Sequence, residues 1–350
     1  MNKFLVTLNL LALLLFWGSA ASALVDGEAF PWLSVVGLAF PFTVAGVAVA
    51  ALCTLLLRWR LLWLPLVGTL LAGGTLREYC PVNLTSPRPK GSLKVVSYNV
   101  KMWGQFLRDA DGTYPVARHL VSLRPDVAAL QEAQYCTEEH KHDMIAYFKR
   151  HGYHTGTVMI EGNLLTCVSK YPILRTDTIC RSQSNGAIAF HLLLAPRDTL
   201  VFINAHLYST HLSPDDLQAY QNMVTKPSAD IKARTQWRTL RKFVAAARER
   251  AIQAKAVAHY VDSLEGKNII VAGDFNDTPV SYPHHVLCQR LTDAYRATGN
   301  GIGRSYNRDA LYVRIDNIFC STHWKPYCCH VDDTSALSDH YPLVAWFKRQ

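Results

Sequence analysis

The first 76 residues contain almost no charge. Their only charged side chains are Lys3, Asp26, Glu28, Arg58 and Arg60. Three uncharged, largely apolar runs lie between these positions, at residues 4–25, 33–57 and 61–76. At a rise of about 1.5 Å per residue, the second run exceeds the roughly 30 Å hydrocarbon core of a bilayer. The sequence therefore predicts a membrane anchor of two to three transmembrane helices over residues 1–76.

The few charges in this segment predict its orientation. Lys3 precedes the first run, and Arg58 and Arg60 separate the second run from the third. The acidic residues Asp26 and Glu28 lie between the first two runs. Because Lys and Arg next to spans stay on the cytoplasmic side, we expect the N-terminus inside. Everything after residue 77 is then periplasmic or extracellular.

Residues 21–23 read Ala-Ser-Ala, which resembles a signal-peptidase site. Cleavage there would remove the first run and leave the topology of the remainder unchanged. The preceding stretch is long for a signal core, so we favour an uncleaved helix over a cleaved signal peptide.

No two of the nine cysteines have the C-x-x-C spacing of a structural zinc site, which excludes that class of domain. Cys53 lies in a predicted span, and the other eight follow residue 77. An even number of cysteines in an oxidising compartment permits disulfides, and buried free thiols are equally compatible with the sequence. The chain also lacks internal repeats and low-complexity tracts.

The remainder of the chain predicts a linker and one large domain. Prolines gather in the linker, residues 77–91, and the domain then covers residues 92–350. Strand-like apolar runs occupy residues 93–100, 126–131, 164–169, 187–194, 199–207, 268–272, 314–320 and 341–347. An apolar stripe at helical spacing predicts a long helix over residues 238–264, and residues 209–236 are a polar excursion. The net charge of +9 suits an anionic partner such as a phosphate-rich substrate.

Polar residues stand at the ends of the predicted strands in six places. These segments are Ser97-Tyr98-Asn99-Val100, Leu130-Gln131-Glu132, Asn204-Ala205-His206-Leu207, Gly273-Asp274-Phe275-Asn276, Arg314-Ile315-Asp316 and Ser338-Asp339-His340. Each alone is more often a turn or a solvated strand end. Together they are expected to converge, because ligands bind at one rim of the sheet in layered α/β folds. Carboxylate and amide oxygens suit a hard cation such as Mg²⁺, and imidazoles and amides suit phosphate oxygens.

The order of these six motifs strongly resembles the endonuclease/exonuclease/phosphatase superfamily, which includes deoxyribonuclease I. The resemblance covers about residues 93–348, and membrane-anchored bacterial members have similar leaders. It implies an α/β fold, a four-layer α/β/β/α sandwich of two packed mixed β-sheets flanked by helices. Here the N-terminal transmembrane helices would precede this sandwich.

The resemblance also implies a role for the polar side chains, beginning with a metal ion. Glu132 corresponds to the principal ligand of Mg²⁺, or of Mn²⁺, with Asn99 beside it and Asp339 supporting the metal side. Asp274 corresponds to the residue that orients or deprotonates the attacking water. Asn276 would bind a phosphate oxygen near that water.

Further side chains would contact the phosphate and its transition state. The resemblance implies that His206 contacts the phosphate. It also implies that His340, held by Asp316, stabilises the pentacovalent state. Asn204 and Asn185 are expected to bind substrate.

The leading prediction is a divalent-metal-dependent phosphoester hydrolase of the phosphodiesterase or nuclease type, anchored in the membrane with its catalytic domain outside. The alternative is a lipid or sugar-phosphate phosphatase, or a phospholipase C-like hydrolase, of the same fold. The sequence lacks a long loop of interleaved basic and aromatic residues, which weakens the nuclease interpretation. The expected partners are therefore a nucleic acid, phospholipid or sugar phosphate and the lipid bilayer, with no protein partner evident.

Two rivals come from other classes. One is a non-catalytic membrane binding protein that kept the fold, although every expected polar position is filled. The other is a small transporter, and spans without internal charged residues argue against a conduction path.

Overall fold

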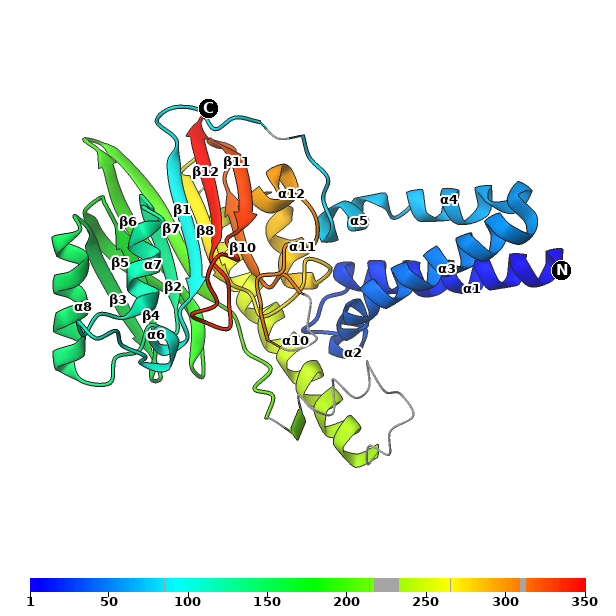
Figure 1. Ribbon diagram of the computed structural model, residues 1–350, viewed down its shortest axis with the longest axis horizontal. Helices are drawn as coiled ribbons and strands as arrows, with labels where there is room; N and C mark the ends of the chain where they lie inside the picture. Colours follow the sequence, from blue (N-terminus) through cyan, green and yellow to red (C-terminus); the bar gives the residue numbers. More distant parts are fainter. Residues whose placement is uncertain (85, 214, 217–232, 265, 309–312) are drawn as a thin grey trace.

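Two β-sheets packed face to face form the centre of the molecule (Figure 1). The computed structural model describes all residues except 85, 214, 217–232, 265 and 309–312. The first sheet has the order β11-β12-β1-β2-β4-β3 and the second the order β5-β6-β7-β8-β10-β9. The strands are β1 (Leu93–Asn99), β2 (Val127–Gln131), β3 (His154–Ile160), β4 (Asn163–Ser169), β5 (Ile173–Ser182), β6 (Asn185–Ala195), β7 (Asp198–His206), β8 (Asn268–Asp274), β9 (Thr292–Asp293), β10 (Asp316–Cys320), β11 (Trp324–Val331) and β12 (Leu343–Arg349). Each sheet contains one parallel pair, β1 with β2 and β7 with β8, among antiparallel neighbours.

Apolar side chains fill the space between the sheets, and helices cover both outer faces. Phe190 and Phe202 of the second sheet pack in one cluster with Val95 and Val127 of the first. The helices of this part are α6 (Lys101–Gln105), α7 (Pro115–Ser122), α8 (Glu138–Arg150), α10 (Ala233–Asp262), α11 (Tyr282–Cys288) and α12 (Ala294–Thr298). Helices α7 and α8 bury their apolar sides on the first sheet, and α10 and α11 bury theirs on the second. The predicted four-layer α/β/β/α sandwich is confirmed.

All eight predicted strands are present, and the four that the sequence did not predict are the edge strands of the two sheets, β3, β5, β9 and β11. Strand β5 is exposed or half-buried along its whole length. An edge strand is covered on fewer sides than a central one, so it needs no continuous apolar run. The long predicted helix is α10, which begins at Ala233. Most of the polar excursion at 209–236 lies outside the described residues.

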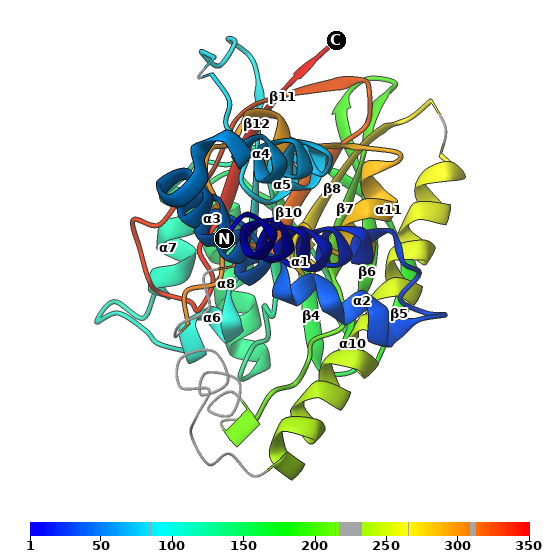
Figure 2. The same ribbon diagram turned by 90° about the vertical axis from the view of Figure 1, so that its right-hand side faces the viewer.

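The first 79 residues, here called the N-terminal module, project from the sandwich as a bundle of helices (Figures 1 and 2). Its helices are α1 (Asn2–Ala21), η1 (Ser22–Leu24), α2 (Pro31–Ser34), η2 (Val35–Ala39), α3 (Phe40–Arg58), η3 (Trp59–Leu61), α4 (Trp63–Leu70) and α5 (Gly73–Tyr79). Two stretches of the described chain, Asn2–Leu24 and Pro31–Leu61, are long and apolar enough to cross a membrane. Only 33% and 22% of their most apolar windows are buried, unlike the core helix of a soluble protein. An N-terminal signal sequence would pass the same test of length and composition.

Two of the predicted spans are shorter than the apolar runs suggest. Residues 33–39 of the second run leave the long helix and lie against the sandwich as the end of α2 and η2. The long helix α3 begins only at Phe40 and has 19 residues, a length of about 28 Å. The third run is divided into α4 and α5 by a break at residues 71–72. Hydropathy alone did not reveal these boundaries because the docked segment is as apolar as the helix that follows it.

Hydrogen bonds between polar side chains join α1 to α3 inside the module. Asn9 donates to the Thr54 hydroxyl at 2.7 Å, and the Ser19 and Thr43 hydroxyls lie 2.8 Å apart. Asn9 and Thr54 are fully buried between the helices. Such polar contacts are a common link between helices in an apolar solvent.

The N-terminal module is bonded to the sandwich at several points. Lys255 of α10 donates to Asp26 at 2.6 Å and to Glu28 at 2.8 Å. Arg314, only 1% exposed, donates to the Glu78 carbonyl at 2.7 Å and to the Ile302 carbonyl at 2.9 Å. The module is therefore packed onto the sandwich rather than tethered to it by a free chain.

Candidate active site

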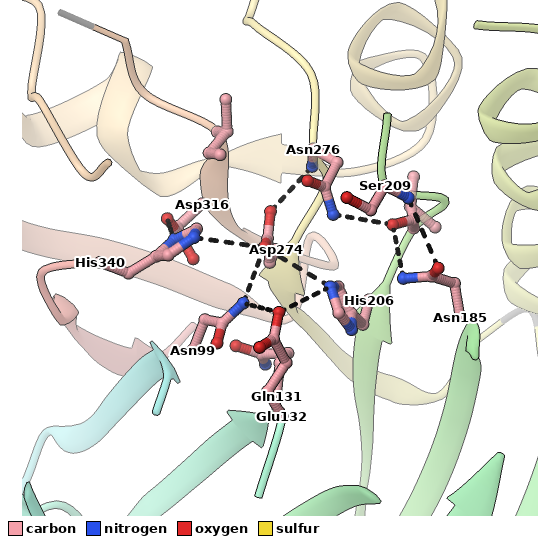
Figure 3. Close-up of polar contacts among 12 residues, drawn as sticks. Asn99, Gln131, Glu132, Asn185, His206, Ser209, Asp274, Asn276, Asp316 and His340 are labelled. Carbon is pink, nitrogen blue, oxygen red and sulfur yellow. Dashed lines mark hydrogen bonds and ion pairs between the residues drawn. The ribbon is translucent and has the colours of Figure 1, made fainter. Parts of the chain in front are cut away.

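Three polar residues stand side by side across the second sheet. Asp274 ends β8, its register partner on β7 is His206, and its partner on β10 is Asp316. Neighbouring strands in register bring their side chains close together on the same face. All three are buried, with at most 3% of their surface exposed. Figure 3 shows their side chains facing a common space.

The first sheet contributes Asn99, the last residue of β1, and Glu132, which follows β2. The Asn99 amide nitrogen donates to Glu132 Oε1 at 3.0 Å and to Asp274 Oδ2 at 3.1 Å (Figure 3). One neutral amide thus joins two carboxylates that come from different sheets. Glu132 has a backbone φ of 52°, a conformation that is unfavourable for a residue with a side chain.

His340 lies between two carboxylates. Its Nδ1 is 2.8 Å from Asp316 Oδ2, and its Nε2 is 3.6 Å from Asp274 Oδ2. Burial disfavours the charged imidazole, but the carboxylates of Asp316 and Asp274 outweigh burial and raise the pKa of His340 to about 10. The ring is therefore protonated at neutral pH. Burial, partly offset by His340, raises the pKa of Asp274 and makes it a stronger base than a solvated carboxylate.

A chain of amides orients His206. Gln134 donates to Asn163 Oδ1 at 3.1 Å, so the other end of the Asn163 amide donates to His206 Nδ1 at 2.9 Å. The proton of the neutral ring then lies on Nε2. This nitrogen is 3.7 Å from Asp274 and 3.8 Å from Glu132. Asn163 could not be predicted from the sequence, because an Asn at the start of a strand has no distinguishing pattern around it.

We expect Asn163→Ala to lower kcat about tenfold with little change in KM. That factor equals about 1.4 kcal/mol, the order of one hydrogen bond. The reason is that His206 loses the donor that fixes its proton on Nε2. Steady-state kinetics on a soluble phosphodiester measure the effect. Gln134→Ala is the matched control. Gln134 bonds Asn163 rather than the His206 ring, so its loss should lower kcat by a smaller factor. Equal rates for Asn163→Ala and the wild type would contradict this role.

Asn276 lies at the cavity, whereas Asn185 and Asn204 lie behind it. Asn276, with a φ of 50°, donates its side-chain amide to the Leu207 carbonyl at 2.9 Å. Asn185 donates to the same carbonyl at 3.1 Å and is 1% exposed. Asn204 is fully buried and donates to the Leu130 carbonyl of the first sheet at 2.9 Å. The sequence predicts substrate contacts for Asn185 and Asn204. In the structure both amides are bonded in the interior, and their contact with substrate stays a prediction.

A left-handed turn places Lys101 at the site. Helix α6 is left-handed, with φ between 39° and 73° from Lys101 to Phe106, at a cost of about 1–2 kcal/mol per non-glycine residue. The Met102 N–H donates to the Glu132 carbonyl at 2.7 Å. The buried Trp103 ring packs against Tyr114 and Phe148. Lys101 Nζ is 2.5 Å from Asp339 Oδ2. Asp339, a predicted metal-side residue, is thus ion-paired, a contact that sequence spacing could not reveal.

The donor set fits a hard cation. Four carboxylates, Glu132, Asp274, Asp316 and Asp339, surround the cavity or lie directly behind it. Ligand atoms of Asp274, Asp316 and His340 lie within 4.8 Å of one another. His340 Nδ1 and Asp316 Oδ2 are already bonded to each other and so are not free to bind a cation. The half-exposed carboxylate of Glu132, in contrast, faces the cavity. Carboxylate oxygens are ligands of Mg²⁺, so Glu132 is the better candidate. Asn99 lies beside it with its amide nitrogen toward the carboxylates, while its Oδ1 accepts from the Lys101 N–H at 3.1 Å.

Comparison with known proteins shows to which family this chain belongs. The model of the Endonuclease/Exonuclease/phosphatase family matches residues 96–340, most of the chain. The chain belongs to the endonuclease/exonuclease/phosphatase family. A second model, of a domain of unknown function, matches residues 2–79 and ends where α5 ends. The comparison with curated proteins gave no match.

Solved structures of the endonuclease/exonuclease/phosphatase fold cover the sandwich. The catalytic domain of human Nocturnin, determined with a sulfate anion, is 14% identical with a TM-score of 0.52, over 77% of this chain and 96% of that one. A family protein from Bacteroides thetaiotaomicron is 18% identical with a TM-score of 0.52, over 74% and 98%. A 3′ phosphatase from Neisseria, bound to a product DNA hairpin, is 18% identical with a TM-score of 0.51, over 73% and 99%. At these identities the likeness establishes the fold.

Proposed function

We propose that this protein is a divalent-metal-dependent phosphoester hydrolase, anchored in a membrane with its catalytic domain outside the cytoplasm. The observation that carries the proposal is the convergence of Glu132, Asp274 and His340 on one cavity of about 290 Å³. Membership of the endonuclease/exonuclease/phosphatase family supports the same reaction class. A non-catalytic binding protein would not need a buried carboxylate with a raised pKa beside a protonated imidazole.

In the proposed reaction, Glu132 would hold Mg²⁺ or Mn²⁺, which would neutralise charge on the phosphate oxygens. Asn99 would lie beside the cation and orients the Glu132 carboxylate through its amide N–H. Asp274 orients the attacking water and accepts a proton from it. His340, positioned by Asp316, donates from Nε2 to an oxygen that gains negative charge. The water oxygen forms the new P–O bond and the ester P–O bond breaks. Asp274 releases the proton that it took to solvent water, which supplies the proton of the leaving alcohol, and the second proton of the attacking water is released from the phosphate product.

The remaining polar residues have narrower roles in this proposal. His206 donates from Nε2 to a non-bridging phosphate oxygen, and Asn276 contacts a second oxygen near the water. Asp339, paired with Lys101, contributes negative charge on the metal side.

A direct test is hydrolysis of bis(p-nitrophenyl) phosphate by the full chain in detergent, with Mg²⁺, with Mn²⁺ and with EDTA. We expect turnover that requires the cation and that is lost in Asp274→Asn prepared in the same way. Turnover at equal rates in both proteins would point to a contaminant and refute the assignment.

The orientation in the membrane is a separate prediction. Lys3, Arg58 and Arg60 flank the spans on one side and Asp26 and Glu28 on the other. An alkaline phosphatase reporter, active only outside the cytoplasm, should be active when fused after Gln350 and inactive when fused after Arg60. The reverse pattern would place the catalytic domain in the cytoplasm.

A further inference from the structure

Polar and apolar side chains together line the cavity of the candidate active site. Glu132, Asp274 and His340 are among the polar ones. Five half-buried apolar side chains from four separate parts of the chain also line it, and are here called the apolar wall. They are Leu38, Leu212, Phe243, Val313 and Ile315. A phosphoester in this cavity would therefore meet both catalytic groups and hydrocarbon.

Leu38 belongs to the N-terminal module and not to the catalytic sandwich. It lies in η2, in the segment that joins α1 to α3. Its neighbour Gly37 packs so closely that a Cβ there would lie 2.4 Å from the Val280 carbonyl. The ion pairs of Lys255 with Asp26 and Glu28 hold the same segment on α10. The position of Leu38 at the cavity is thus fixed by close packing and by charge.

In the proposed topology, the segment that carries Leu38 lies at the membrane surface. It connects the two apolar helices α1 and α3, which run side by side away from the sandwich (Figures 1 and 2). The aromatic side chains of Phe30 and Trp32 are 59% and 51% exposed at this junction. Aromatic residues of this kind gather at the membrane–water interface. The cavity therefore adjoins the layer of lipid headgroups.

Among the residues that the structure describes, three cations beside the cavity are paired within the protein. Lys101 is bonded to Asp339, Arg250 to Asp277, and Lys242 to Asp216. Binding along a nucleic acid backbone draws on cations that are free to replace its counterions. The apolar wall, together with the pairing of these three cations, favours an amphiphilic substrate over a nucleic acid.

We propose that the substrate is a membrane lipid whose headgroup phosphoester meets the catalytic groups of the cavity while its first apolar carbons contact Leu38 and Phe243. The inference rests on the proposed hydrolase function and names the substrate class of the same site. The reaction is the hydrolysis described above, with the lipid phosphoester consuming one water and giving a phosphate product and an alcohol.

The test uses the full chain in mixed micelles with Mg²⁺. The probes are dioleoyl phosphatidylglycerol and dioleoyl phosphatidate, their acyl-free headgroups glycerophosphoglycerol and glycerol phosphate, a DNA oligonucleotide, and bis(p-nitrophenyl) phosphate. We expect kcat/KM for a lipid to exceed that for its acyl-free headgroup at least tenfold. We expect Leu38→Asn to lower the ratio of lipid to acyl-free turnover at least fivefold. Leu33→Asn is the matched control, since this exposed leucine of the same segment is not part of the cavity wall and should keep the ratio.

The outcomes separate the two proposals. Cation-dependent hydrolysis of the chromogenic diester, with no preference for lipids or with preference for DNA, would overturn the lipid inference and leave the hydrolase function standing. A ratio that falls equally in Leu33→Asn and Leu38→Asn would also overturn it, because the effect would then not depend on the cavity wall. Failure of the wild type to exceed Asp274→Asn on every probe would overturn the hydrolase function itself.

Discussion

Replacing Asp274 by Asn is expected to lower kcat by about 10²–10⁴-fold with little change in KM, the range typical of acid–base groups. Asp274 is 1% exposed and sits in register between His206 and Asp316. The amide has nearly the same size, so the packing is kept while the base is lost. The matching change at His340, to Ala, should lower kcat in the same range because a charge-stabilising donor is removed.

The double variant should be hardly slower than either single one. His340 Nε2 is 3.6 Å from Asp274, and residues that act as a unit in catalysis are strongly non-additive. The measurement is kcat and KM on a soluble phosphodiester, with the melting temperature of each variant alongside. If Asp274 only caps the strand end, the folded Asp274→Asn protein would keep its rate and lose about 1 kcal/mol of stability. Full activity in that protein would therefore refute the mechanism.

Glu132→Gln should abolish most activity and most of the thermal stabilisation that Mg²⁺ confers. The glutamine keeps the shape of the side chain beside Asn99 but removes the charge that a cation requires. A ligand at 100 times its Kd stabilises the native state by about 2.7 kcal/mol, and this shift disappears when affinity is lost.

Melting scans of the full chain in detergent, with MgCl₂ and with EDTA, measure this effect. Glu161→Gln is the matched control, because Glu161 is an exposed residue of the turn between β3 and β4 and should leave the Mg²⁺ shift unchanged. An undiminished Mg²⁺ shift in Glu132→Gln would exclude Glu132 as the principal ligand.

The central strands of both sheets could be predicted from the sequence, whereas the edge strands could not. Central strands such as β1, β4 and β8 are buried along almost their whole length, so each leaves a continuous apolar run. Each of the four edge strands contains exposed residues and leaves no such run. Apolarity also could not separate the docked residues 33–39 from α3, because both segments are apolar.

The candidate site was predictable where its residues terminate strands. Asn99, Glu132, His206, Asp274 and His340 all follow or precede apolar strands, and the sheets carry these ends to one place. Their neighbours depend on tertiary structure alone. Lys101 reaches Asp339 only because of the left-handed turn, and no sequence pattern distinguishes a left-handed lysine from any other.

Asn185 and Asn204 show what a position at a strand end does not reveal. Both lie at or near strand ends, as the residues at the cavity do, yet their side chains are buried and bond carbonyls of the interior. The direction of each side chain depends on the pleat and on the packing of the two sheets, which the sequence pattern does not give. Their contact with substrate stays a prediction.

The buried guanidinium of Arg314 bonds the sandwich to the N-terminal module. It donates to the Glu78 carbonyl and lies 4.1 Å from the centre of the Tyr295 ring. Two residues later Asp316 holds His340. Proteolysis that separated the sandwich from the module would take away the Glu78 carbonyl and leave a buried cation short of an acceptor, which is costly. The same cut would remove Leu38 from the cavity, so the isolated sandwich would not be equivalent to the full chain.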